Sequence, residues 1–136
     1  MIDHTGLKVS NPKMSRVFYE KSLAPLGYKM MMEIPKEYTN GQVVLGFGVP
    51  PKPDFWVSEG EPNSPRIHIA FRAENHKQVD EFYKAALKAG GKDNGAPGPR
   101  PHYHEHYYGA FVLDPDGHNI EAVCHGRQSG GSIDRN

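Results

Sequence analysis

The chain has 136 residues, and its sixteen Lys and Arg residues balance sixteen Asp and Glu residues, so its formal net charge is zero. This length fits one domain, and the lack of a basic excess argues against nucleic acid or an acidic membrane surface as a partner. Cys124 is the single cysteine, which excludes an intrachain disulfide and favours a reducing, cytoplasmic location. No apolar run approaches the length of a membrane span and no signal peptide is readable, so we expect no membrane partner.

The first half of the chain predicts a strand, a helix and three further strands. Residues 2–9 are short and partly apolar, and Asn11 is placed to cap a helix that has Pro12 at its first position. Met14, Val17, Phe18 and Lys21 follow the spacing of one helix face, and because three of the four are apolar this face is predicted to be the buried stripe. The strands that follow are expected at residues 28–34, 43–49 and 55–58, with a hairpin signal at Asn40-Gly41.

The second half repeats this plan. Residues 67–71 predict a strand, Asn75 is a plausible cap, and the next helix has the stripe Val79, Phe82, Tyr83, Ala86 and Leu87. Residues 90–101 are rich in Gly and Pro and predict a loop, so a strand near Lys92 is poorly marked. A strand over residues 107–113, a tight turn over 114–117 and a returning strand over 119–124 complete this half.

An internal duplication explains the repetition. Sliding residues 4–27 forward by 64 positions gives seven identities in twenty-four and lays His4 on His68. We therefore predict an α+β fold in which two β-α-β-β-β modules form one domain over residues 1–126. Module 1 covers about residues 1–60 and module 2 about residues 65–126. The Gly- and Ser-rich residues 127–136 are expected to be a flexible tail.

Three side chains are expected to share one face of the sheets. Alternation along the first strand of each module turns apolar residues toward the helices and turns His4 and His68 the other way. Glu121 alternates with apolar neighbours and faces the same side, where a buried carboxylate needs a cation or a proton to compensate it. Two imidazoles and one carboxylate are a donor set for Fe, Mn, Zn or Ni that leaves coordination positions open.

The paired modules, the His near the start of each and the ending FVLDPDGHNIEAV over residues 111–123 resemble the vicinal oxygen chelate superfamily. That superfamily includes glyoxalase I, extradiol dioxygenases, fosfomycin-resistance enzymes and bleomycin-resistance proteins. The resemblance covers roughly residues 2–125. It implies a cupped mixed sheet with the helices outside, one divalent metal ion, and His4, His68 and Glu121 as its ligands.

This chain departs from individual members of that superfamily. Glyoxalase I-like members usually draw a fourth carboxylate ligand from the last strand of module 1, where this chain has Phe55-Trp56-Val57; Asp54 or Glu59 would substitute only in a shifted register. Fosfomycin-resistance enzymes usually carry Thr two residues after the first His, where this chain has Gly6. Bleomycin-resistance proteins bind their ligand without a metal.

A His-rich segment over residues 100–108 supplies further candidates. We predict His104 and Tyr107 as catalytic residues, one of them acting as a general base, although a solvated loop is an equally good interpretation of the segment. Aromatic and polar side chains of the expected pocket are predicted to bind substrate: Phe47, Trp56, Arg100, His102 and Tyr108.

These patterns predict a metal-dependent enzyme that acts on a small organic substrate chelated through adjacent oxygens. A glyoxalase-like lyase or isomerase and a ring-cleaving dioxygenase both fit the residues. The alternative is a metal-free small-molecule binding or sequestration protein of the bleomycin-resistance type. We expect a homodimer, and the site can close either within one chain or across the dimer.

Overall fold

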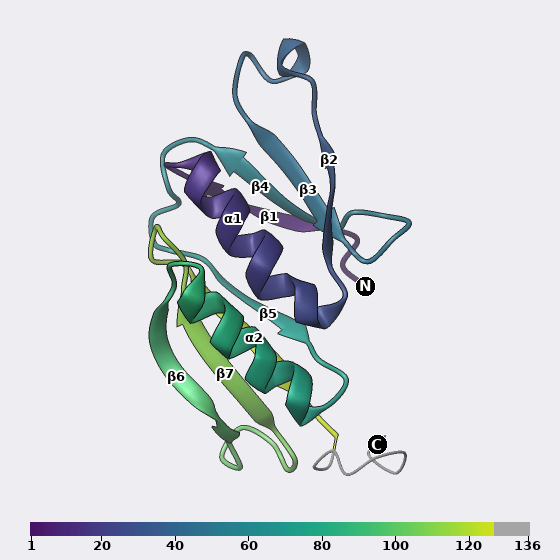
Figure 1. Cartoon of the computed structure of the whole chain (residues 1–136), viewed down its shortest axis with the longest axis vertical. Helices are drawn as coiled ribbons and strands as arrows, with labels where there is room; N and C mark the ends of the chain where they lie inside the picture. Colours follow the sequence, from purple (N-terminus) through teal and green to yellow (C-terminus); the bar gives the residue numbers. More distant parts are fainter. Residues whose placement is uncertain (127–136) are drawn as a thin grey trace.

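The structure, a computed structural model, describes residues 1–126, so the tail predicted over residues 127–136 lies outside the described residues. Both modules have the predicted order strand, helix, three strands, which confirms the α+β class (Figure 1). Module 1 contains β1 (Thr5–Val9), α1 (Pro12–Leu23), β2 (Lys29–Glu33), β3 (Val44–Gly48) and β4 (Phe55–Glu59). Module 2 contains β5 (His68–Arg72), α2 (His76–Lys88), β6 (Lys92–Pro99), β7 (Tyr108–Leu113) and β8 (Asn119–Cys124).

Each module folds into its own mixed sheet of four strands. The strand orders are β1-β4-β3-β2 and β5-β8-β7-β6, and the first strand of each module runs parallel to the last while the other pairs are antiparallel. In Figure 1 the two helices lie side by side on the same side of the sheets. One face of each sheet is therefore covered by helices, and the other face is left open.

Both predicted helix caps are confirmed. The side-chain oxygen of Asn11 accepts a hydrogen bond from the Met14 N–H, and that of Asn75 accepts one from the Gln78 N–H. Each bond satisfies a backbone donor that has no partner within the first turn of a helix. The two modules therefore begin their helices by the same local chemistry, as the duplication predicts.

The predicted buried stripe of α1 is wrong by about one residue. Met14 and Val17 are 54% and 45% exposed, whereas the buried face consists of Ser15, Phe18, Tyr19, Ser22 and Leu23. Two serines lie on that face, and a pattern that counts only apolar residues does not detect them. Their small side chains let the helix approach its neighbours closely.

Aromatic rings join the two modules into one core. Tyr19 lies 5.1 Å from Phe55 between ring centroids, and Phe55 lies 5.1 Å from Phe71 of module 2. Tyr28 also packs edge-on against Phe71 at 5.2 Å. Such edge-to-face pairs are favourable geometries for aromatic rings. The modules therefore share a continuous hydrophobic core along the helix side of the sheets.

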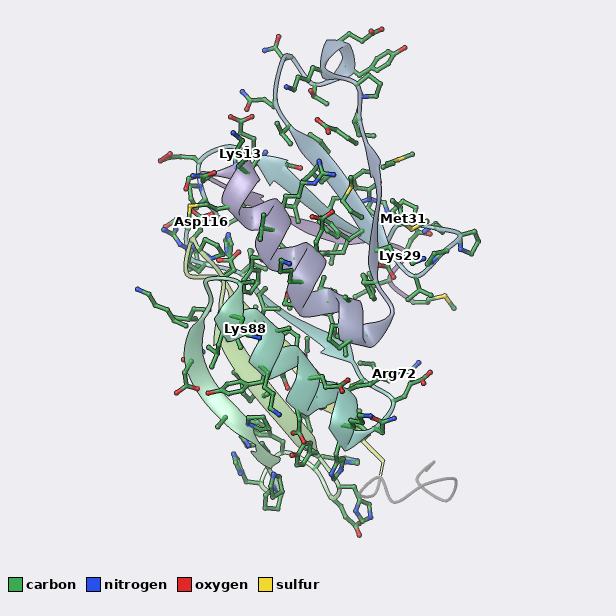
Figure 2. The ribbon with its side chains drawn as sticks, in the orientation of Figure 1. Lys13, Lys29, Met31, Arg72, Lys88 and Asp116 are labelled. Carbon is green, nitrogen blue, oxygen red and sulfur yellow. The ribbon has the colours of Figure 1, made fainter. Side chains whose placement is uncertain are left out.

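The turn before β8 adds polar contacts between the modules. The buried His118 ring accepts a hydrogen bond at Nδ1 from the Ile67 N–H, 3.0 Å away, and donates from Nε2 to the Lys8 carbonyl at 2.8 Å. Asp116, labelled in Figure 2, accepts hydrogen bonds from the backbone and the side chain of Ser10 at the end of β1. The DPDGHN segment is therefore a structural joint between the modules.

Two connections differ from the sequence-based expectation. Asn40 and Gly41 both have positive φ, but they lie in a long connection over residues 34–43 that also contains a 3₁₀-helix at Lys36–Tyr38, so β2 and β3 are not joined by a two-residue hairpin turn. The loop predicted over residues 90–101 is wrong in part, because β6 forms at Lys92–Pro99 and pairs with β7 through two register shifts. Proline is tolerated in β6 because it is an edge strand. None of the helices formed by residues 1–126 has the length and apolar character needed to cross a membrane.

Candidate functional site

The open face of the sheets carries the predicted metal ligands. Leu7 and Val9 of β1 and Phe71 of β5 are buried on the helix side. His4, just before β1, and His68, the first residue of β5, are exposed and alternate with those apolar residues. The predicted orientation of both histidines, away from the helices, therefore agrees with the burial pattern.

Glu121 is a buried carboxylate in the middle of module 2. It lies in β8 with only 1% of its surface exposed, and one carboxylate oxygen is 2.9 Å from His68 Nε2. The Tyr107 hydroxyl donates a short hydrogen bond to the other oxygen. Both oxygens of this carboxylate are thus held, one by the neighbouring edge strand and one by the segment that leads into β7.

The Tyr107 phenol is kept in its protonated form by this arrangement. Burial raises the pKa of Tyr107 well above its usual value, and its hydrogen bond to Glu121 acts in the same direction. A phenol that donates to a carboxylate cannot ionise without placing two negative charges side by side. Tyr107 is therefore a stable donor to Glu121 at neutral pH.

His4 does not contact this pair in the single chain. Its Nδ1 lies 2.8 Å from Asp3, and Asp3 is also 2.9 Å from the Lys52 ammonium. His4 and His68 nevertheless line the same pocket, which measures about 410 Å³. Within residues 1–126, no group of three or more His, Cys, Asp or Glu side chains is arranged to hold a metal ion. The structure thus brings His68 and Glu121 into contact, while His4 shares a pocket with His68 without completing a metal-binding group.

The register of module 1 shows which residue occupies the counterpart of Glu121. Gly6 pairs with Trp56 in the same way as Ala70 pairs with Glu121, and each small residue follows its histidine by two positions. Trp56 therefore stands in the strand from which glyoxalase I-like members usually draw a fourth ligand. No register shift brings in Glu59, which alternates with Trp56 and so lies on the helix side of β4. The remaining carboxylate, Asp54, precedes β4 and has one buried oxygen without a hydrogen-bond partner.

Two of the predicted substrate-binding residues do not reach the open face. Phe47 is fully buried in the core between Tyr19 and Phe55, because its position in β3 alternates onto the helix side. Tyr108 also faces the helices, where its hydroxyl donates to Asp80 at 2.7 Å. Burial, followed by this hydrogen bond, raises the pKa of Tyr108 to about 12. Both predictions counted aromatic character and overlooked strand alternation.

Arg100 lies beside the predicted site, over the ring of Phe111, a residue that was not among the predicted site residues. Its guanidinium carbon is 5.4 Å from the ring centroid of Phe111, and that ring is 6.3 Å from the ring of His68. Phe111 pairs with Glu121 across β7 and β8, so the two share a face. The alternation of β7 in the printed sequence could have identified Phe111, since it lies four residues after Tyr107 in an extended strand.

The His-rich segment forms a chain of ring contacts at the end of module 2. The rings of His102 and Tyr103 are 4.2 Å apart, and Tyr103 in turn lies 5.1 Å from Tyr107. His104 is exposed and contacts the ring of His125 at 5.4 Å. Tyr107 is thus the member of this segment that touches Glu121, while His102 and His104 lie farther along the ring chain.

Several solved structures share the fold of this chain at low sequence identity. A glyoxalase/bleomycin resistance protein from Albidiferax ferrireducens is 22% identical over 91% of this chain and 98% of its own, with a TM-score of 0.67. A hypothetical protein from S. aureus is 24% identical over 88% of this chain and 92% of its own, with a TM-score of 0.64. A glyoxalase I mutant from Zea mays is 22% identical over 90% of this chain, with a TM-score of 0.66, and this chain spans 46% of its length.

The family comparison covers nearly the whole of the described chain. No curated protein matches the sequence. The model of the glyoxalase/bleomycin resistance protein/dioxygenase superfamily matches residues 1–122, which include both histidines and Glu121. The two repeated modules agree with that match, and the chain therefore belongs to the glyoxalase/bleomycin resistance protein/dioxygenase superfamily.

Proposed function

We propose that this protein is a divalent-metal-dependent enzyme for a small organic substrate that chelates the metal through adjacent oxygens. His68 and Glu121 of one copy and His4 of a second copy would hold the ion. The carrying observation is that a His and a buried Glu lie 2.9 Å apart, whereas within residues 1–126 His4 does not complete a metal-binding group with them. A homodimer with two equivalent sites would supply the missing ligand to each.

The residues present fit a divalent cation. Glu121 is a buried carboxylate whose partners are a neutral phenol and a half-exposed imidazole, so a cation would compensate its charge. Imidazole and carboxylate suit Fe, Mn, Zn or Ni, and three protein ligands leave room for two substrate oxygens. Trp56 at the counterpart of Glu121 supports a set of three ligands rather than four.

The protein's own side chains would orient the substrate around this set. Tyr107 would fix the Glu121 carboxylate by donating to one of its oxygens, and Arg100 over Phe111 would provide a positive charge near the open face. The bound ion would supply Lewis acidity to an enolate or oxyanion, or would activate dioxygen if it is iron. A lyase or isomerase reaction and a dioxygenase reaction are both consistent with this proposal.

Complementation between two variants tests the proposal sharply. His4→Ala and Glu121→Ala would each abolish metal binding when purified alone. When both are co-expressed, a mixed dimer has one site that lacks both ligands and one site that is intact. Random pairing then restores about a quarter of the wild-type metal content, measured by elemental analysis of the untagged protein.

A matched control distinguishes metal binding restored by a site shared between two copies from metal binding restored by co-expression alone. Co-expression of His68→Ala with Glu121→Ala removes two ligands from the same module, so every site in the mixed dimer lacks a ligand and no metal returns. Rescue in neither pair would place the site within one chain. Wild-type protein that takes up no metal would refute the enzyme proposal and favour the metal-free binding protein, for which Glu121 is already hydrogen-bonded at both oxygens.

A further inference from the structure

The open face of module 1 contains a hollow around the only tryptophan of the chain. The hollow measures about 450 Å³ and is lined by His4, Gly6, Ile34, Val44, Trp56 and Ser58, together with Thr5. None of these lining residues of the described chain is Lys, Arg, Asp or Glu. His4 lies at one side of the hollow, so a molecule bound by His4 would extend over this apolar surface.

Gly46 makes space for the indole, and Gly6 makes space for the backbone and Cβ of the same residue. A Cβ atom at Gly46 would lie 2.8 Å and 2.9 Å from the indole carbons Cζ3 and Cη2 of Trp56, closer than real contacts allow. A Cβ atom at Gly6 would lie 2.6 Å from the Trp56 carbonyl oxygen and 3.2 Å from its Cβ. The ring therefore lies across the strand next to Gly46 instead of standing away from the sheet, and it remains partly exposed.

A bulge in β2 turns two more apolar side chains to the same face. Met30 pairs with the core residue Phe47, but Met32 pairs with Gly46, so the strand gains one residue at Met31, which Figure 2 labels beside β2. Such a bulge reverses which side chains face each side of a sheet. Met32 is consequently 44% exposed, and Ile34 lies in the hollow beside Val44.

We infer that the substrate carries a flat, uncharged, apolar group, such as a phenyl ring, and that Trp56 is the specificity-determining residue on which this group stacks. This inference rests on the proposed function, because it places the chelating oxygens of the substrate beside His4. Aromatic groups stack favourably on an indole, and the residues that line the hollow present an uncharged surface beneath such a group.

Mandelate and lactate test this inference, because both chelate a metal through a 2-hydroxy carboxylate and they differ only in carrying a phenyl or a methyl substituent. Calorimetric titration of the zinc-loaded protein should give a dissociation constant for mandelate at least about tenfold lower than that for lactate. Trp56→Ala should bring the two constants together while leaving the zinc content and the affinity for lactate unchanged. Trp56→Phe should keep part of the preference, and Tyr38→Ala, at an exposed tyrosine outside the hollow, should keep all of it.

Equal binding of the two acids by the wild-type protein, or an unchanged preference in Trp56→Ala, would overturn the inference. Failure of the proposed function is seen separately, as zinc content near zero. In that case quenching of the Trp56 fluorescence of metal-free protein by mandelate but not by lactate supports stacking of an aromatic group on Trp56, and equal responses refute it.

Discussion

The buried carboxylate of Asp114 should contribute strongly to stability through one identifiable partner. Asp114 is 3% exposed and accepts hydrogen bonds from the Tyr19 hydroxyl at 2.6 Å, the Asp116 N–H at 2.9 Å and the His118 N–H at 2.8 Å. Asp114→Ala leaves three donors without this acceptor. Because a buried unsatisfied donor costs about 1–3 kcal/mol and such losses are not additive, we expect about 3–5 kcal/mol of destabilisation.

A double-mutant cycle with Tyr19→Phe isolates the contact that links α1 to module 2. A hydrogen bond to a charged acceptor is worth about 1.5–3 kcal/mol, so the coupling free energy between Asp114 and Tyr19 should fall in that range. Urea unfolding of the wild type, both single variants and the double variant measures it, provided that all four unfold in two states. A coupling below about 0.5 kcal/mol would refute the Asp114–Tyr19 hydrogen bond as a stabilising link between α1 and module 2.

Three further outcomes can be measured on the same protein. Glu121→Ala should remain folded by circular dichroism but bind no metal by elemental analysis, and unchanged metal affinity would contradict the ligand assignment. Asn11→Ala and Asn75→Ala should each lower the free energy of unfolding by about 1 kcal/mol, and no loss in urea unfolding would contradict their capping role. Burial, then Asp114, raises the pKa of Tyr19 well above 10. The stability from this shift is therefore present below the unfolded pKa and falls above about pH 10, where the unfolded state releases a proton that the folded state keeps. In Tyr19→Phe the fall of unfolding free energy between pH 10 and 11 should be smaller by about 1 kcal/mol, and an unchanged fall in urea unfolding would contradict this assignment.

Local chemistry explains why much of the fold could be predicted from the sequence. Asn11 and Asn75 are strong caps, and the duplication places them at equivalent positions, so the helix starts did not depend on tertiary contacts. The strand over β8 was predicted with its observed bounds because alternation and a tight Asp-Pro-Asp-Gly turn both mark it. These features act over a few residues, which is the range that a single sequence reports well.

The errors arise where distant partners decide the outcome. Ser15 and Ser22 are buried because α1 packs against other elements, and no local pattern separates a buried serine from an exposed one. β6 forms despite its Gly and Pro residues because β7 offers it an edge to pair with. The distance between His4 and the His68 and Glu121 pair depends on how the two modules pack against each other, which the repeat alone does not specify.

The comparison of Trp56 with Glu121 explains how one duplicated backbone can provide two different half-sites. Both residues pair with the small residue that follows a histidine by two positions, so the duplication left the backbone geometry in place and changed one side chain. In module 2 that position bears a carboxylate, held by His68 and Tyr107. In module 1 it bears an indole, for which Gly46 makes space. The carboxylate of module 2 and the indole of module 1 can contact the same bound substrate only if they face each other. Within residues 1–126 of one chain, the predicted ligands of the two modules do not form one metal-binding group. Pairing of the open faces of two copies would bring unlike halves together twice, which is why we place both the proposed metal and the aromatic group stacked on Trp56 at that contact.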